Sequence, residues 1–227
     1  MVSSIHVSYQ IILTFPLVWV ENGGIVGRGV LLDYASWATS QGLKVEHLTT
    51  HKISLSDLKK VAESQNITFR PNDILFIRSG YINALSSLSK DDATVYASKT
   101  AAMPAIGVES GVDMLKWLWS NQFAAVAGDM IAFEALPFQS KEYWLHEWLL
   151  AGWGLPIGEL FDLEALTAEC RKLGKWSFFF SSVPLKVCVL LNSKSIDSAD
   201  NFRFLEGWRA HRMVSLFCDE KNPDREY

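Results

Sequence analysis

The sequence is poor in cysteine and has no large excess of charge of either sign. Its 227 residues contain three cysteines, Cys170, Cys188 and Cys218, and its formal net charge is −4. An odd number of widely spaced cysteines argues against a disulfide framework or a paired-cysteine zinc site, and favours reduced thiols in the cytoplasm. The small negative charge lacks the basic footprint that binding to nucleic acid or an anionic membrane requires. We therefore expect no nucleic-acid partner and no membrane partner.

Targeting signals are also missing. The first twenty residues, "MVSSIHVSYQIILTFPLVWV", contain an apolar run, but no lysine or arginine precedes it and no small-residue cleavage site follows it. A secretory signal peptide needs both features, and a membrane span needs a longer apolar run. We interpret residues 1–22 as an atypical N-terminal arm that packs less closely than the rest of the chain.

The chain has no phosphate loop, nucleophile elbow or dinucleotide-binding fingerprint, and no internal repeat or linker. Instead, apolar runs alternate with segments of helical periodicity. The runs that predict strands are "GVLLDY", "DILFIRSG", "FAAVAGD" and "WSFFFSSVPLKVCVLL". The segments that predict helices are "YASWATSQG", "SLSDLKKVAESQN", a polar stretch over 83–98, "SGVDMLKWLWSNQ" and "DLEALTAECRKLG". This alternation predicts a single α/β domain with parallel strand pairing.

Three charged residues stand at the ends of predicted strands, where α/β folds carry their chemistry. Arg78 ends an aliphatic strand beside Gly80, and its fork of donors suits a substrate carboxylate, although an ion pair at the rim is the alternative. Asp129 follows "AAVAG" and either orients a ligand or caps the following helix. Asp33 has the same two interpretations.

One histidine and one glutamate are separated by helix-breaking residues. His146 lies in the apolar helical run "KEYWLHEWLL", and Glu159 comes thirteen residues later. Gly152, Gly154 and Pro156 fall between them, so the helix of His146 should end near Gly152 and the chain should return. Such a return brings an imidazole and a carboxylate together, to bind a metal or exchange a proton. The alternative is a partly buried histidine with local hydrogen bonds.

A second histidine pair, His47 and His51 in "HLTTH", has i, i+4 spacing but lacks the glutamate of the metalloprotease motif. Thr49 and Thr50 favour a strand, on which residues four apart lie about 13 Å from each other. We therefore do not expect this pair to hold a metal.

An ordered series of segments resembles the cyclase family that includes kynurenine formamidase, in a form common in fungi. The segments are "GRGVLLDYASWA", "HKISLSDLKKVA", "DILFIRSGY", "GVESGVDMLKWLW", "FAAVAGD", "LHEWLLAGWGLPIGELFDLEAL" and "WSFFFSSVPLKV". The resemblance covers residues 23–187, which we interpret as a cyclase-like domain. Residues 188–227 are then an atypical C-terminal tail.

The resemblance implies a swivelling β/α/β fold, a homo-oligomer, and a hydrolase that uses a divalent metal, zinc or manganese. Its substrate would be a small-molecule formamide or related carbonyl compound, as in the arylformamidase step from tryptophan to kynurenine. By position, His146 and Glu159 would be metal ligands and catalytic residues. Arg78 and Asp129 are the candidates for substrate binding.

The family's other metal-site segment has no counterpart in this sequence. Family members carry a His-x-Gly-Thr-His-x-Asp motif before the "GVLLD" strand, whereas residues 1–28 contain only His6 and no aspartate. After "PLKV" the sequence again departs from the family's pattern. These departures suggest a truncated or altered member, incomplete at both ends, with impaired activity. A non-catalytic member that acts as a binding or oligomerisation module is the alternative.

Overall fold

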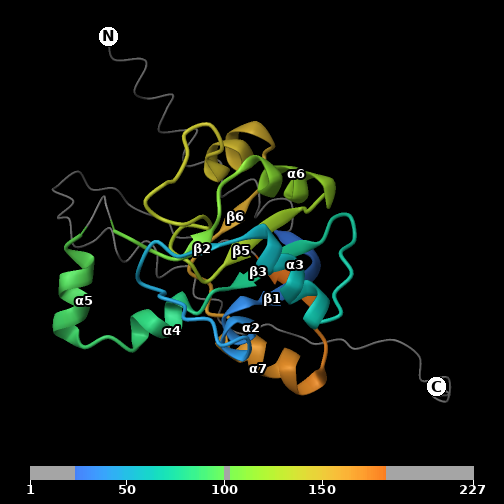
Figure 1. Ribbon diagram of the computed structural model, residues 1–227. Coiled ribbons are helices and arrows are strands. Elements are labelled where there is room, and N and C mark those ends of the chain that lie inside the picture. The colour runs from blue at the N-terminus through green and yellow to red at the C-terminus, as the bar shows by residue number, and fades with distance from the viewer. Residues whose placement is uncertain (1–23, 100–102, 183–227) are drawn as a thin grey trace, which may run out of the picture. The chain divides into compact units, whose positions relative to one another are not determined.

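We describe the protein from a computed structural model, which defines residues 24–99 and 103–182. The strands are β1 (Ile25–Asp33), β2 (Lys52–Ile53), β3 (Ile74–Arg78), β4 (Gly107–Val108), β5 (Ala125–Gly128), β6 (Ile157–Gly158) and β7 (Ser177–Ser182). The helices are α2 (Tyr34–Ser40), α3 (Leu55–Ser64), α4 (Tyr81–Ser86), α5 (Lys90–Ala97), α6 (Val112–Ser120), the π-helix η2 (Glu147–Gly152) and α7 (Glu164–Leu173). The predicted α/β class is confirmed (Figure 1).

The described residues belong to two compact units. The larger unit contains Arg28–Phe179, and every site discussed below lies within it. Of the smaller unit, the described residues are 24–27 and 180–182, at the outer ends of β1 and β7. The expected N-terminal arm, residues 1–22, and the expected tail, residues 188–227, lie outside the described residues.

A central sheet organises the larger unit, with the strand order β6-β5-β3-β1-β7. Strands β1, β3, β5 and β6 pair in parallel, and the β1–β3 register runs from Gly29 opposite Ile74 to Asp33 opposite Arg78. A second, two-stranded parallel sheet joins β2 to β4. The parallel pairing inferred from the alternating pattern is thus confirmed, and the central sheet is open rather than a closed barrel.

The strands of this sheet were readable because both of its faces are buried. Val30, Leu31 and Leu32 of β1 are fully buried, and every residue of β3 is buried. Parallel strands covered on both sides appear in sequence as continuous aliphatic runs rather than as alternating patterns. Because the strands are parallel, the polar residues that end them lie at one edge of the sheet.

Local hydrogen bonds and backbone geometry fix the ends of the helices expected over "SLSDLKKVAESQN" and "DLEALTAECRKLG". Ser54 Oγ accepts from the backbone N–H of Asp57 at 3.1 Å and begins α3. Gly174 ends α7 with a φ of +61°, in the left-handed region that favours glycine. The first turn of α3 and the last turn of α7 are therefore determined by residues close in sequence, and not by contacts with distant parts of the chain.

The structure confirms one expectation about local structure and contradicts another. The polar stretch over 83–98 is largely helical, as expected, and is divided between α4 and α5 because Ser89 caps a new helix by accepting from Asp92 N–H at 3.1 Å. The segment "HLTTH" forms a turn rather than a strand: the backbone N–H of Thr49 bonds to the carbonyl of Glu46 at 3.2 Å. Strand β2 starts only at Lys52.

Among residues 24–99 and 103–182, no helix has the length and the apolar character needed to cross a bilayer.

Candidate functional site

The charged residues that the sequence analysis selected stand along one edge of the central sheet. Asp33 and Arg78 are the last residues of β1 and β3, while Asp129 and Glu159 directly follow β5 and β6. Because these four strands are parallel, their carboxyl ends share an edge, where α/β folds bind ligands. The sheet order therefore places a row of ionisable groups across neighbouring strands.

His146 meets Glu159 at this edge. The helical segment of His146 runs into η2, which ends at Gly152 as predicted, and the backbone N–H of Trp153 closes a π-type turn onto the carbonyl of Trp148 at 2.9 Å. The chain then returns through β6, and Nε2 of His146 lies 2.9 Å from Oε1 of Glu159. The predicted proximity, within about 6 Å for two ligands of one ion, is confirmed as geometry.

Glu134, which the sequence analysis did not identify, holds the other side of His146. Its Oε1 accepts from the backbone N–H of His146 at 3.0 Å and lies 2.7 Å from His146 Nδ1. Its Oε2 accepts from the backbone N–H of Leu145 at 2.9 Å and from the hydroxyl of Ser110. A glutamate in the apolar run "MIAFEALPF" was the available signal, because a fully buried glutamate nearly always has partners.

The two carboxylates determine the charge of His146. Burial lowers the pKa of His146, but hydrogen bonds and charge from Glu134 and Glu159 outweigh it and raise the pKa to about 9. Burial raises the pKa of Glu134, while its bonds from His146, Ser110 and two backbone N–H groups outweigh that effect and lower it. In the metal-free protein His146 is therefore an imidazolium between two carboxylates.

Asp129 holds the turn between β3 and α4. Its Oδ1 accepts from the N–H of Ser79 at 2.6 Å and from the Ser79 hydroxyl at 2.7 Å, and its Oδ2 accepts from the N–H of Gly80 at 2.7 Å. Burial raises the pKa of Asp129, against the donors and the charge of Arg78, which lower it. The expected cap of the following helix was wrong, because Asp129 binds the start of α4, which precedes it in the chain.

Arg78 has partners within the protein. Its Nε and Nη2 donate to the two carboxylate oxygens of Glu164 at 2.9 and 2.8 Å, and its Nη1 donates to Asp33 at 2.7 Å. Asp33 also caps α2, as one of its two interpretations predicted, by accepting from the N–H of Ser36 at 3.2 Å. The fork of Arg78 is thus occupied, as the ion-pair alternative anticipated.

His47 and His51 have different neighbours. His51 Nε2 lies 2.8 Å from the hydroxyl of Tyr34, whereas His47 lines a pocket beside Gly80. Burial is the main reason that the pKa of each histidine is lowered. We argued against a metal site here because we expected a strand, which would hold the two rings far apart. The segment is instead a turn, and in it each ring contacts different residues.

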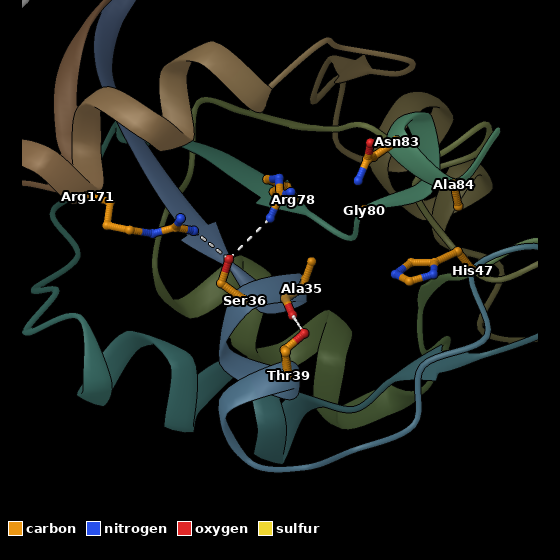
Figure 2. Close-up of a pocket in the computed structure, with 9 residues that line it drawn as sticks. All are labelled: Ala35, Ser36, Thr39, His47, Arg78, Gly80, Asn83, Ala84 and Arg171. Carbon is orange, nitrogen blue, oxygen red and sulfur yellow. Dashed lines mark hydrogen bonds between the residues drawn. The ribbon is translucent and has the colours of Figure 1, made fainter. Parts of the chain in front are cut away.

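This pocket, of about 480 Å³, opens where β1 and β3 end. Figure 2 shows its lining residues, with the side chains of Arg78 and Arg171 on one side and His47 on the other. Ser36 of α2 accepts from both arginines, and Asn83 of α4 also lines the pocket. None of the residues that line the pocket is acidic, and neither His146 nor Glu159 is among them.

Comparison with known proteins identifies the family. The family model named Cyclase matches residues 16–135, which is more than half of the chain. The chain belongs to the Cyclase family. A search of curated proteins found no match.

Solved structures resemble this Cyclase member over most of its length. A novel cyclase is 29% identical, with a TM-score of 0.60, and the match covers 72% of this chain and 50% of that one. Isatin hydrolase A from Labrenzia aggregata, bound to benzyl benzoate, is 14% identical, with a TM-score of 0.50, and the match covers 74% of this chain and 57% of that one. The chain thus spans about half the length of these proteins.

The donor set of this Cyclase member fits part of a divalent-metal site. A neutral His146 offers Nε2 and Glu159 offers a carboxylate oxygen, and Glu134 accepts from the other ring nitrogen, the arrangement that orients histidine ligands. Within residues 24–99 and 103–182, no three histidine, cysteine or acidic side chains gather closely enough to hold an ion. The described residues therefore bring together one imidazole and two carboxylates, Glu134 and Glu159.

Proposed function

We propose that this Cyclase-family chain is a metal-dependent amide hydrolase, similar to arylformamidase, that acts on a small-molecule formamide or related carbonyl compound. The observation that carries the proposal is the 2.9 Å approach of His146 Nε2 to Glu159, with Glu134 fixed behind the ring. Family membership and a fold similar to that of a hydrolase support the reaction class. The step from tryptophan to kynurenine that releases formate is the reaction we propose to test.

The residues have separate tasks in this proposal. His146 and Glu159 bind zinc or manganese. Glu134 accepts a hydrogen bond from Nδ1–H of His146, so that the lone pair on Nε2 points towards Glu159. The metal, when bound, supplies Lewis-acid chemistry that polarises the amide carbonyl and makes water a better nucleophile. Glu159, the more exposed of the two carboxylates, can also take up a proton.

Arg78 and Asp129 serve the substrate mainly by positioning. Arg78 lines the pocket at the end of β3, while Asp129 fixes Ser79 and Gly80 in the same turn. A substrate carboxylate that contacted Arg78 directly would have to compete with Glu164, because the two oxygens of Glu164 already accept from Nε and Nη2 of the guanidinium group. We propose Arg78 and Asp129 as substrate-side residues on this basis.

Ligand number limits the activity that we expect. A catalytic zinc site usually has three protein ligands and one open position, so two ligands hold the metal weakly. The His-x-Gly-Thr-His-x-Asp motif that resembling proteins carry is not in this sequence. We therefore propose that the chain, as its sequence stands, hydrolyses formamides slowly.

A second candidate is a non-catalytic family member that forms a homo-oligomer. Its support is an exposed aromatic cluster: the Trp153 ring lies 5.1 Å from Trp119 and 6.3 Å from Trp148, and these two side chains are 61% and 43% exposed. Clustered exposed tryptophan is typical of protein interfaces. Sedimentation of the chain beside Trp119→Ser tests this candidate; a monomer in both would remove it.

The first proposal is tested with an absorbance assay on N-formylkynurenine, with added zinc or manganese. The natural chain is compared with His146→Ala, and with a chimera whose first 28 residues carry the His-x-Gly-Thr-His-x-Asp motif. We expect low metal-dependent turnover by the natural chain, higher turnover by the chimera, and none when His146 is replaced in either. Activity that survives the loss of His146 in the chimera would overturn the assigned site.

A further inference from the structure

The pocket between the ends of β1 and β3 has an unbalanced lining. It presents two arginines and no acidic side chain, whereas the acids that neutralise the arginines, Asp33 and Glu164, do not line it. Asp33 is almost completely buried, with 2% of its side chain exposed. A ligand in the pocket therefore meets donors, and the compensating negative charges lie outside its walls.

Of the two arginines that line the pocket, Arg171 is the one with N–H donors that have no partner among the described residues. Its Nη2 donates to Ser36 Oγ at 2.6 Å and to Asp33 Oδ2 at 3.1 Å, while its side chain is 59% exposed. Among the residues that the structure describes, its Nε and Nη1 have no partner, in contrast to Arg78, which is bound by Glu164 on both arms of its fork. Fixed at Nη2, Arg171 keeps free N–H groups for a carboxylate.

The hydroxyl group of Ser36 is a second hydrogen-bond donor for a ligand in the pocket. Its hydroxyl oxygen accepts from Arg171 Nη2 and, at 3.3 Å, from Arg78 Nη1 (Figure 2). Two guanidinium groups on one oxygen direct the hydroxyl proton away from both, and the described part of the chain offers that proton no acceptor. A hydroxyl whose oxygen already accepts from two guanidinium groups can donate its proton to an anion, and has little capacity left to accept from a further donor.

The part of the pocket lined by His47, Gly80 and Asn83 has uncharged hydrogen-bonding groups and no bulky side chain at position 80. His47 has no side-chain hydrogen bond to the described residues, and burial lowers its pKa, helped by the charges of His51 and Arg78. A side chain at Gly80 would place its Cβ 2.9 Å from His47 Nε2, and the φ of +88° there favours glycine as well. Gly80 therefore keeps the floor of the pocket clear, with the Asn83 amide above it.

From these contacts we infer that the pocket binds a small monocarboxylate with a short apolar body, separately from the His146–Glu159 pair. Arg171 and the Ser36 hydroxyl receive the carboxylate, and the apolar body lies against Ala35 and Ala84 of the same lining. Arg78, a proposed substrate-side residue, also lines this pocket. The inference still does not depend on the proposed hydrolysis, because it assigns the carboxylate to Arg171 and Ser36, and no residue of the pocket is a proposed metal ligand.

The test is calorimetric titration of the full chain with benzoate, benzamide and inorganic phosphate. Metal is removed by dialysis, because chelators such as EDTA themselves carry carboxylates, and no turnover is involved. Benzamide matches benzoate in shape but lacks the charge. We expect benzoate to bind on the order of ten-fold more tightly than benzamide, as for a charge-assisted fork contact. Equal binding of the two, or preference for phosphate, would overturn the inference.

Three variants locate the contact. Arg171→Met keeps the apolar stem and should lose about ten-fold in benzoate affinity, with benzamide unchanged. Lys172→Met, whose side chain is 71% exposed, removes a neighbouring surface charge and should change neither. Ala84→Leu fills the pocket and should abolish both. An equal loss in Arg171→Met and Lys172→Met, or full binding by Ala84→Leu, would place the ligand elsewhere.

Discussion

Glu134 holds His146 by two contacts to a single carboxylate oxygen: Oε1 accepts the backbone N–H at 3.0 Å and lies 2.7 Å from the ring Nδ1. The backbone bond fixes where the helical segment begins, and the ring contact fixes which way the imidazole faces. Since Nε2 then points to Glu159, one buried acid sets the geometry of the whole pair. The stability and the ligand chemistry of this edge should both depend on Glu134.

Replacing Glu134 should destabilise the protein far more than replacing Glu159. Glu134→Ala leaves the buried N–H of Leu145 and the partly buried donors of Ser110 and His146 without their acceptor, at a cost of about 3 kcal/mol in the free energy of unfolding. Glu159→Gln alters a side chain that is 32% exposed, at a cost below about 1 kcal/mol. Urea unfolding of the metal-free variants measures both. Equal losses would show that Glu134 does not organise this segment.

The stability of the metal-free chain should fall as pH rises above neutrality. The pKa of His146 is raised to about 9 in the folded state, so between its ordinary value of 6.5 and 9 the folded protein holds more protons than the unfolded chain. Stability from this group is complete below 6.5 and is lost as pH passes through 9. Because His146 is partly exposed, we expect a loss of about 2 kcal/mol.

Thermal unfolding in a series of buffers from pH 6 to 10 measures this loss. His146→Gln is the matched control and should show a flatter profile over the same range. A wild-type melting temperature that stays level between pH 7 and 9.5, relative to the control, would mean that the imidazole is neutral in the folded protein.

Metal affinity should depend on Glu134 even though Glu134 is not a proposed ligand. An acid that accepts from the second nitrogen of a ligating histidine fixes the ring, and the loss of such a partner lowers affinity or activity by about 10–100-fold. We expect Glu134→Gln to weaken zinc binding within that range and His146→Ala to weaken it further. Competition with a chromophoric chelator gives both values. Unchanged affinity in Glu134→Gln would indicate that Nδ1 needs no anchor.

The sequence predicted the parts of the fold and site that depend on local signals. Leu31, Leu32 and their neighbours in the strands form aliphatic runs, which identify a sheet buried on both faces. The return of Glu159 towards His146 follows from the helix-ending residues around Gly152, whose effect is local. The capping contact of Ser54 with Asp57 spans only three residues. Each of these signals is complete within a short window.

The remaining contacts could not be predicted because their partners are distant in the chain or are joined by a loop without periodicity. Glu164 occupies the fork of Arg78 across 86 residues, and Arg171 reaches Ser36 across 135. Glu134 meets His146 through an irregular loop, where neither helical nor strand periodicity applies. Sequence alone therefore left both Arg78 interpretations open and missed the buried acid.

Asp129 should control the local stability of α4, which follows directly on the turn that it holds. Its Oδ1 accepts from Ser79 and its Oδ2 accepts from the N–H of Gly80, and Asp129 is 1% exposed. Asp129→Asn replaces one acceptor with an NH2 group, which faces a backbone N–H and repels it. We expect the protein to stay folded but to lose about 2 kcal/mol in the free energy of unfolding.

The decisive measurement is hydrogen exchange, because a local opening exposes only the amides near the turn. In Asp129→Asn, the amides from Ser79 to Ala84 should exchange faster by a larger factor than those of α3. Asp92→Asn, at the exposed cap of α5, provides the control and should accelerate exchange only within α5. If Asp129→Asn accelerated exchange uniformly across the sheet, Asp129 would support the global fold rather than this turn. Protection of Gly80 equal to that in the natural chain would instead mean that its N–H has another acceptor.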